Sequence, residues 1–142
     1  MIENIAVFSE EVDFLYTYED HLGSWILDTI ASESNELESL NIIFCSDEFL
    51  LNINKEYLNH DYYTDIITFD YSSDKIEGEL YISIDRVREN ASELDISLNL
   101  ELHRVIIHGV LHLCGYSDKS EEEEKTMRLK EDTYLKNCSW VD

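Results

Sequence analysis

Two spacings of hydrophobic residues recur along this chain and predict its secondary structure. Across residues 40–44 apolar side chains alternate, which is typical of a strand with a buried face. Across residues 18–33 apolar side chains recur every three or four positions, which is typical of an amphipathic helix. Similar patterns predict strands at about 5–8, 66–69 and 80–84, and helices after Ser46 or Asp47, after Asp85, at about 99–114 and from about Ser120.

Polar residues mark the expected starts of two of the later helices. Asp85 is expected to cap the third helix, because its side chain can accept a hydrogen bond from a free backbone N–H. Ser120 and Glu123 have the spacing of a capping box at the start of the last helix. The acidic run at 121–124 falls in the first turn, where the helix dipole favours anions, so helix formation alone explains it.

The order of these elements, β-α-β-α-β-β-α-α-α, indicates an α+β fold. We expect residues 1–142 to form a single small domain, in which about five helices cover a mixed, mostly four-stranded sheet. The segment at about 99–114 is apolar on nearly every side, so it is expected to be a central buried helix.

Composition places the chain among globular proteins. It has 44% hydrophobic residues, and no apolar run approaches the length of a transmembrane helix. The N-terminus lacks the basic and apolar regions of a secretory signal, so we expect a cytoplasmic protein without a membrane partner. The three cysteines, Cys45, Cys114 and Cys138, show no paired spacing and are expected to be free thiols.

The charge is unusual, because 10 Lys and Arg stand against 32 Asp and Glu, a formal net charge of −22. Such a chain is not expected to bind DNA or nucleic acids in general, since that affinity depends on cations that neutralise phosphates. Two interpretations remain: the acidic surface only keeps the protein soluble, or it attracts a basic partner protein.

The main candidate for chemistry is a pair of histidines, His108 and His112, on the expected central helix. Their spacing places both imidazoles on one helical face, where they can hold two corners of a tetrahedral zinc site. Gly115 is suited to end the helix in a left-handed conformation, and the turn that follows can bring Asp118 back as a third ligand. The alternative is a buried apolar helix that happens to carry two histidines.

The stretch His108–Tyr116 resembles the signature of the YbeY-type endoribonucleases, H-G-x-L-H-L-x-G-Y-D-H, at its first nine positions. The chain departs from it at the last two, where Ser117 and Asp118 replace Asp-His. The resemblance extends upstream through Asn54-x-x-Tyr57, Thr64–Phe69 and Gly78–Ile82.

That resemblance implies an α+β fold and a zinc-dependent, single-strand-specific endoribonuclease in 16S rRNA maturation and ribosome quality control. It also implies rRNA as substrate and a basic small-subunit ribosomal protein as partner. In place of the family's third histidine, Asp118 would complete one Zn²⁺ site with His108 and His112. Alternatively, Asp118 only caps the next helix.

A second departure concerns the arginine that follows the family's N-x-x-Y motif and is thought to contact the substrate phosphate. Here Leu58 follows Tyr57 and offers no charge. Arg104, one turn before His108, and His60 are the candidates to compensate, so both are our candidate catalytic residues. The alternatives are an ion pair of Arg104 with Glu101 and a simple turn position for His60.

The sequence is also compatible with two other functions. One is a ribosome-associated assembly factor whose metal is structural and whose nuclease activity is weak or missing. The other, less favoured, is a metalloprotease-like hydrolase. Metalloproteases of the H-E-x-x-H type use the glutamate after the first histidine as general base, and Gly109 cannot move a proton.

Overall fold

Nine elements follow each other in the predicted order in the computed structural model, which describes residues 4–141. The strands and helices are β1 (Ile5–Glu10), α1 (Glu19–Ser32), β2 (Leu37–Cys45), α2 (Asp47–Leu58), β3 (Ile66–Asp70), β4 (Ile76–Ser83), α3 (Ile84–Leu94), α4 (Leu98–Leu113) and α5 (Glu121–Leu135). The predicted α+β class with five helices is confirmed.

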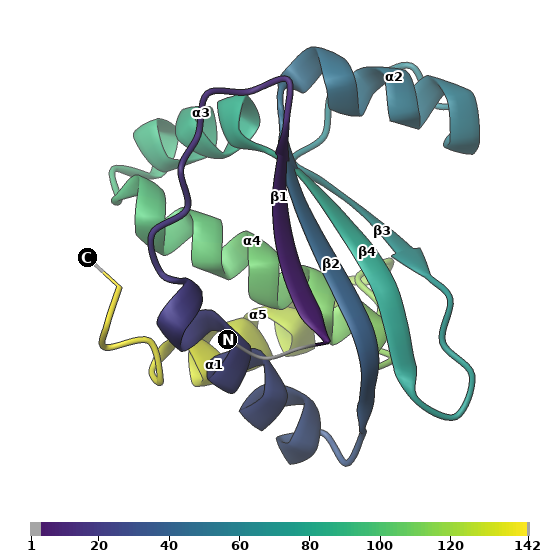
Figure 1. Ribbon diagram of the computed structural model, residues 1–142, viewed down its shortest axis with the longest axis vertical. Helices are drawn as coiled ribbons and strands as arrows, with labels where there is room; N and C mark the ends of the chain where they lie inside the picture. The colour runs from purple at the N-terminus through teal and green to yellow at the C-terminus, as the bar shows by residue number, and fades with distance from the viewer. Residues whose placement is uncertain (1–3, 142) are drawn as a thin grey trace.

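The four strands form one mixed sheet in the order β1-β2-β4-β3 (Figure 1). β1 pairs in parallel with β2, which is consistent with the helical crossover α1 between them. β2 also pairs in parallel with β4, whereas β3 and β4 pair antiparallel as neighbours in sequence. The predicted mixed sheet is therefore confirmed.

Both faces of the sheet are covered. On one face Leu40, Ile42 and Leu80 are buried in the main core, which also contains side chains of α1, α4 and α5. On the other face Cys45 and Ile67 are buried against α2 in a smaller cluster. Burial on both faces explains why the second half of β2 is apolar at consecutive positions.

The helix α4 is the central element that the sequence predicts, and it crosses one face of the sheet (Figure 1). Ile106, Val110 and Leu111 are fully buried. At Gly109 a Cβ atom would lie 2.8 Å from both Ile66 Cδ1 and Leu80 Cδ2, so this glycine allows α4 to approach β3 and β4 closely. The glycine thus serves the close packing of α4 on β3 and β4.

Several boundaries differ from the sequence prediction. β2 begins at Leu37, three residues before the expected start at residue 40. β4 begins at Ile76, four residues before the expected start at Leu80, because Ile76 already pairs with Leu37 of β2. The prediction that Asp85 caps α3 is wrong: the cap is Ser83, whose Oγ accepts a hydrogen bond from the Arg86 N–H at 3.1 Å. Asp85 instead accepts a hydrogen bond from the backbone N–H of Asp47. The predicted capping box at the start of α5 is confirmed.

Further features agree with the sequence. The three cysteines are free thiols. None of the helices within residues 4–141 is long and apolar enough to cross a membrane. His103 on α4 is buried and forms a hydrogen bond with the Tyr16 hydroxyl at 2.7 Å, and burial lowers its pKa to about 4.

Candidate metal centre

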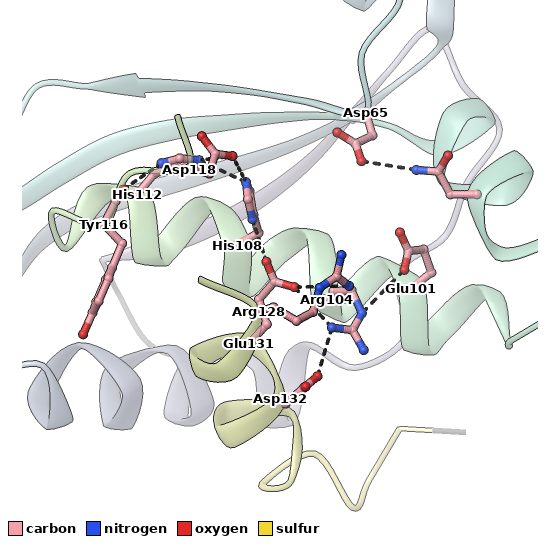
Figure 2. Close-up of polar contacts among 11 residues, drawn as sticks. Asp65, Glu101, Arg104, His108, His112, Tyr116, Asp118, Arg128, Glu131 and Asp132 are labelled. Atoms are coloured by element: carbon pink, nitrogen blue, oxygen red, sulfur yellow. Dashed lines mark hydrogen bonds and ion pairs between the residues drawn. The ribbon is translucent and has the colours of Figure 1, made fainter. Parts of the chain in front are cut away.

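The two histidines of α4 point toward the same place outside the helix (Figure 2). The Nε2 atoms of His108 and His112 lie 3.0 Å apart, and each ring is mostly but not fully buried. This arrangement follows from the spacing of one helical turn, which places both rings on one face. The two nitrogen atoms can therefore act together on a single ligand.

A turn after α4 brings a carboxylate to these rings. Gly115 has a φ of 105°, which is the left-handed conformation expected of a glycine at this position. The N–H of Gly115 donates to the His112 carbonyl, and the N–H of Tyr116 donates to the Leu111 carbonyl, which together form a Schellman motif. Asp118 Oδ2 consequently lies 3.3 Å from His108 Nε2 and 3.5 Å from His112 Nε2.

The donor set fits a zinc ion. One ligand atom each of His108, His112 and Asp118 lies within 4.8 Å of the others. Two imidazole nitrogens and one carboxylate oxygen are ligands that zinc accepts, and three protein ligands leave a position open for water or substrate. The N-cap of α5 is Ser120, so the capping role considered for Asp118 is taken by another residue.

The far nitrogen of each histidine is held by a hydrogen-bond acceptor. His108 Nδ1 donates to Glu131 Oε2 at 2.7 Å, and His112 Nδ1 donates to the Tyr116 carbonyl at 2.9 Å. A carbonyl and a carboxylate only accept, so the protons sit on Nδ1 and the Nε2 lone pairs remain available to a metal. Such partners fix the orientation of the ring and raise its basicity as a ligand.

Glu131 also determines the charge of the site. Burial lowers the pKa of His108, but the hydrogen bond and negative charge of Glu131, with Asp118 and Asp65, outweigh it and raise the pKa overall. Arg104 Nη1 in turn lies 3.2 Å from Glu131 Oε1. The guanidinium compensates the buried carboxylate, which allows Glu131 to remain an acceptor for His108.

Glu131 is not among the site residues that the sequence predicts, because it is 23 residues after His108 and on another helix. Met127, Glu131 and Tyr134 are the buried residues of α5. A glutamate at i+4 on an otherwise apolar helical stripe is the signal that could have identified it, because a buried carboxylate needs a partner.

Of the two candidate catalytic residues, Arg104 faces carboxylates. Its guanidinium lies 3.8 Å from Glu101, 3.2 Å from Glu131 and 3.1 Å from Asp132 (Figure 2). The ion pair with Glu101 that the sequence suggests as an alternative role is therefore present, together with two further ion pairs. His60 follows α2 and stacks on the Tyr62 ring at 5.1 Å between centroids. A catalytic role for either residue stays a prediction.

A groove of about 480 Å³ connects His60 to the three candidate metal ligands. Its lining combines the three candidate ligands with β3 and with the segment after α2. Leu58, at the position where the resembled family has arginine, also lines it. The lining residues away from the metal site are Asn54, Leu58, His60, Tyr62, Thr64, Asp65, Ile66, Ile67, Thr68 and Asp70.

Comparisons with known proteins agree on one family. The family model described as endoribonuclease YbeY matches residues 8–139. The chain is 52% identical to the endoribonuclease YbeY of Flavobacterium psychrophilum over 130 residues, or 91% of this chain and 93% of that protein. It is 47% identical to the endoribonuclease YbeY of Cytophaga hutchinsonii, over 94% of both chains. The solution structure of TM1509 from Thermotoga maritima superposes with a TM-score of 0.66 at 26% identity, over 93% of this chain and 87% of that one.

Proposed function

Because this chain belongs to the endoribonuclease YbeY family, we propose that it is a zinc-dependent endoribonuclease specific for single-stranded RNA. It would act in the cytoplasm in 16S rRNA maturation and ribosome quality control, with residues 1–142 as one functional domain. The observation that carries the proposal is the convergence of His108, His112 and Asp118 at one end of an open groove.

His108 and His112 would hold the ion through Nε2, and Asp118 through a carboxylate oxygen. A bound zinc ion would supply a Lewis acid that polarises a phosphate and acidifies water at neutral pH. Glu131 keeps the Nδ1 proton of His108 in place and so presents the Nε2 lone pair to the site. The Tyr116 carbonyl does the same for His112.

The remaining groove residues would bind the strand. The stacked rings of His60 and Tyr62 offer an aromatic surface for an unpaired base, which is a common way to bind single strands. His60 is also the candidate to contact a phosphate in place of the family's arginine. Arg104 would act through Glu131, because its guanidinium contacts carboxylates on α4 and α5.

The test is to replace His108 and His112 by alanine, one at a time, and to measure zinc content and cleavage of single-stranded RNA. We expect each variant to lose most of its zinc and at least about 100-fold of its cleavage rate, since a ligand matters at least as much as the partners that orient it. His21→Ala is the matched control, because His21 lies on α1 and stacks on Trp140 away from the site.

Each result of this test has a distinct meaning. A full zinc equivalent in both alanine variants would place the metal elsewhere. Stoichiometric zinc in the parent without any cleavage would favour the alternative, an assembly factor with a structural metal. That alternative is motivated by Leu58, which brings no charge to the groove where the family has arginine.

Contacts with another protein would bring this protein to its RNA substrate. With a net charge of −22, the chain alone is expected to bind single-stranded RNA weakly and with a shallow salt dependence, because few phosphates are neutralised. A basic protein of the small ribosomal subunit would supply the attraction. Fluorescence anisotropy of a labelled RNA across a salt series measures this, and tight binding with a steep slope would contradict it.

A further inference from the structure

A second cavity lies next to the metal centre, on the other side of His108. It has a volume of about 340 Å³, within the range of small-molecule sites. α3, α4, α5 and the start of β3 enclose it, and it shares Asp65, Ile66 and His108 with the groove. A ligand in this cavity would therefore lie beside whatever occupies the groove.

One buried carboxylate in this cavity lacks a hydrogen bond. The side chain of Glu101 is only 6% exposed, and its Oε1 has no hydrogen-bond partner among the residues that the structure describes. Arg104 Nε is 3.8 Å away, an ion-pair contact that is too long for a hydrogen bond. An unmade hydrogen bond at a buried carboxylate costs free energy, so this oxygen is suited to a ligand that donates.

A second acceptor faces the same space. Figure 2 shows the carboxylates of Asp65 and Glu101 pointing toward the same region between β3 and α4. Asp65 receives one side-chain hydrogen bond, from Asn90 at 3.2 Å. Burial is the largest cause that raises the pKa of both carboxyl groups, and for Asp65 it outweighs the hydrogen bonds from Asn90 and from the backbone N–H groups of Asp65 and Ile66, which lower the pKa.

The other walls restrict the ligand. Ile66, Leu94 and Val105 are apolar, and Arg104 and Arg128 present guanidinium groups on which an aromatic ring can stack. The four carboxylates Asp65, Glu93, Glu101 and Glu131 outnumber these two cations, which disfavours an anion. A chelated metal ion is also disfavoured, because these carboxylates do not form a group of three ligand atoms within 4.8 Å among the described residues.

We propose that this cavity is a guanine-binding subsite, in which Glu101 and Asp65 accept the N1–H and 2-amino protons of one unpaired base of the RNA. Guanine presents two adjacent donors on its Watson–Crick edge, whereas adenine, cytosine and uracil each present fewer. The inference rests on the proposed function, because the base would belong to a strand that continues into the neighbouring groove. It adds a base preference near the cleaved phosphate.

The experiment titrates the full-length, zinc-loaded protein with the 5′-monophosphates of guanosine, inosine, adenosine, cytidine and uridine, and follows backbone amides by NMR. All five carry the same phosphate, so differences in affinity report on the base. Inosine lacks only the 2-amino group, and its monophosphate should bind at least about tenfold more weakly than that of guanosine, because hydrogen bonds to charged groups are strong. The shifted amides should include those of Ile66, Glu101 and Val105.

Two variants locate the effect. In Glu101→Gln the preference for guanosine over inosine monophosphate should fall to about twofold or less, since the charged acceptor is lost. Glu56→Gln, the same change at an exposed position on α2 outside the cavity, should keep the full preference. The substitution at Glu101 removes a buried charge and keeps the side-chain shape, so the variant is expected to fold.

The outcomes separate this subsite from the nuclease activity. Selective guanosine monophosphate binding in a protein that cleaves no RNA would support the subsite and contradict the proposed function. Cleavage of RNA by a protein that binds all five monophosphates alike would overturn the subsite alone. Shifts of the same amides by Mg²⁺ alone, without a response to guanosine monophosphate, would also overturn it, because the cavity would then be a cation site.

Discussion

Asp118→Ala is expected to weaken zinc binding at least about 100-fold, whereas Asp118→His should retain it. The alanine removes the third ligand and leaves only the two histidine nitrogens. The histidine variant restores the residue type that the related family signature has at this position, and an imidazole is an equally good zinc ligand. Competition with a chromophoric chelator measures both affinities, and cleavage of single-stranded RNA should fall in parallel for the alanine variant.

The two ligand types also differ in charge. A carboxylate leaves the zinc complex with one positive charge less than a third imidazole would, so the bound ion should attract phosphate less strongly. Asp118→His is therefore expected to lower the KM for RNA while zinc content stays complete. Asp13→Ala serves as the control, because it removes an exposed carboxylate that is far from Asp118 in the sequence. Unchanged zinc affinity in Asp118→Ala would mean that water, and not Asp118, completes the site.

The convergence of the three candidate metal ligands was predictable from sequence where its geometry is local. His108 and His112 are one helical turn apart, and Gly115 follows at the distance where a Schellman motif needs a left-handed residue. Asp118 follows within three residues of that turn. Each of these relations depends on backbone geometry over a few residues, which the sequence pattern describes well.

The residues that support the site were not predictable in the same way. Glu131 reaches His108 from another helix, and its contact depends on how α5 packs on α4. The partners of Arg104 depend on the same packing, since two of its three carboxylates belong to α5. The incorrect prediction that Asp85 caps α3 has a related cause. Its carboxylate is used by the backbone of Asp47, 38 residues away, while Ser83 at the end of β4 caps α3.

The second large effect, on the stability of the fold, is expected from substitution of Glu33. This residue follows α1 and connects three parts of the fold. Its carboxylate accepts hydrogen bonds from the Tyr116 hydroxyl at 2.6 Å, from the Tyr134 hydroxyl and from Lys130 Nζ at 3.2 Å. It thereby joins the end of α1 to α5 and to the turn that carries Asp118, the candidate third metal ligand. Glu33→Ala should lower the free energy of unfolding by about 3 kcal/mol, because hydrogen bonds to a charged group are lost and two partly buried hydroxyls are left without an acceptor.

The contribution of Glu33 should also depend on pH. Burial raises its pKa, but the hydrogen bonds from Tyr116, Tyr134 and Lys130 outweigh this and lower the pKa overall from its ordinary value of 4.5. A carboxyl group whose pKa is lower in the folded state stabilises the fold above its unfolded pKa, and this stabilisation is lost as the pH falls through the folded value. The stability difference between the parent and Glu33→Gln should thus be largest near neutral pH and should shrink below about pH 4.5.

Urea unfolding of both proteins at a series of pH values measures this difference. Glu38→Gln is the matched control, because Glu38 is exposed on β2 and the same change there should alter the stability little at any pH. Zinc affinity is a second readout, since Tyr116 links Glu33 to the carbonyl that orients His112. Loosening of the Tyr116 turn should lower zinc affinity in Glu33→Ala more than in Glu38→Gln. Parallel pH curves for the parent and Glu33→Gln would mean that the three donors find other acceptors when this carboxylate is neutralised.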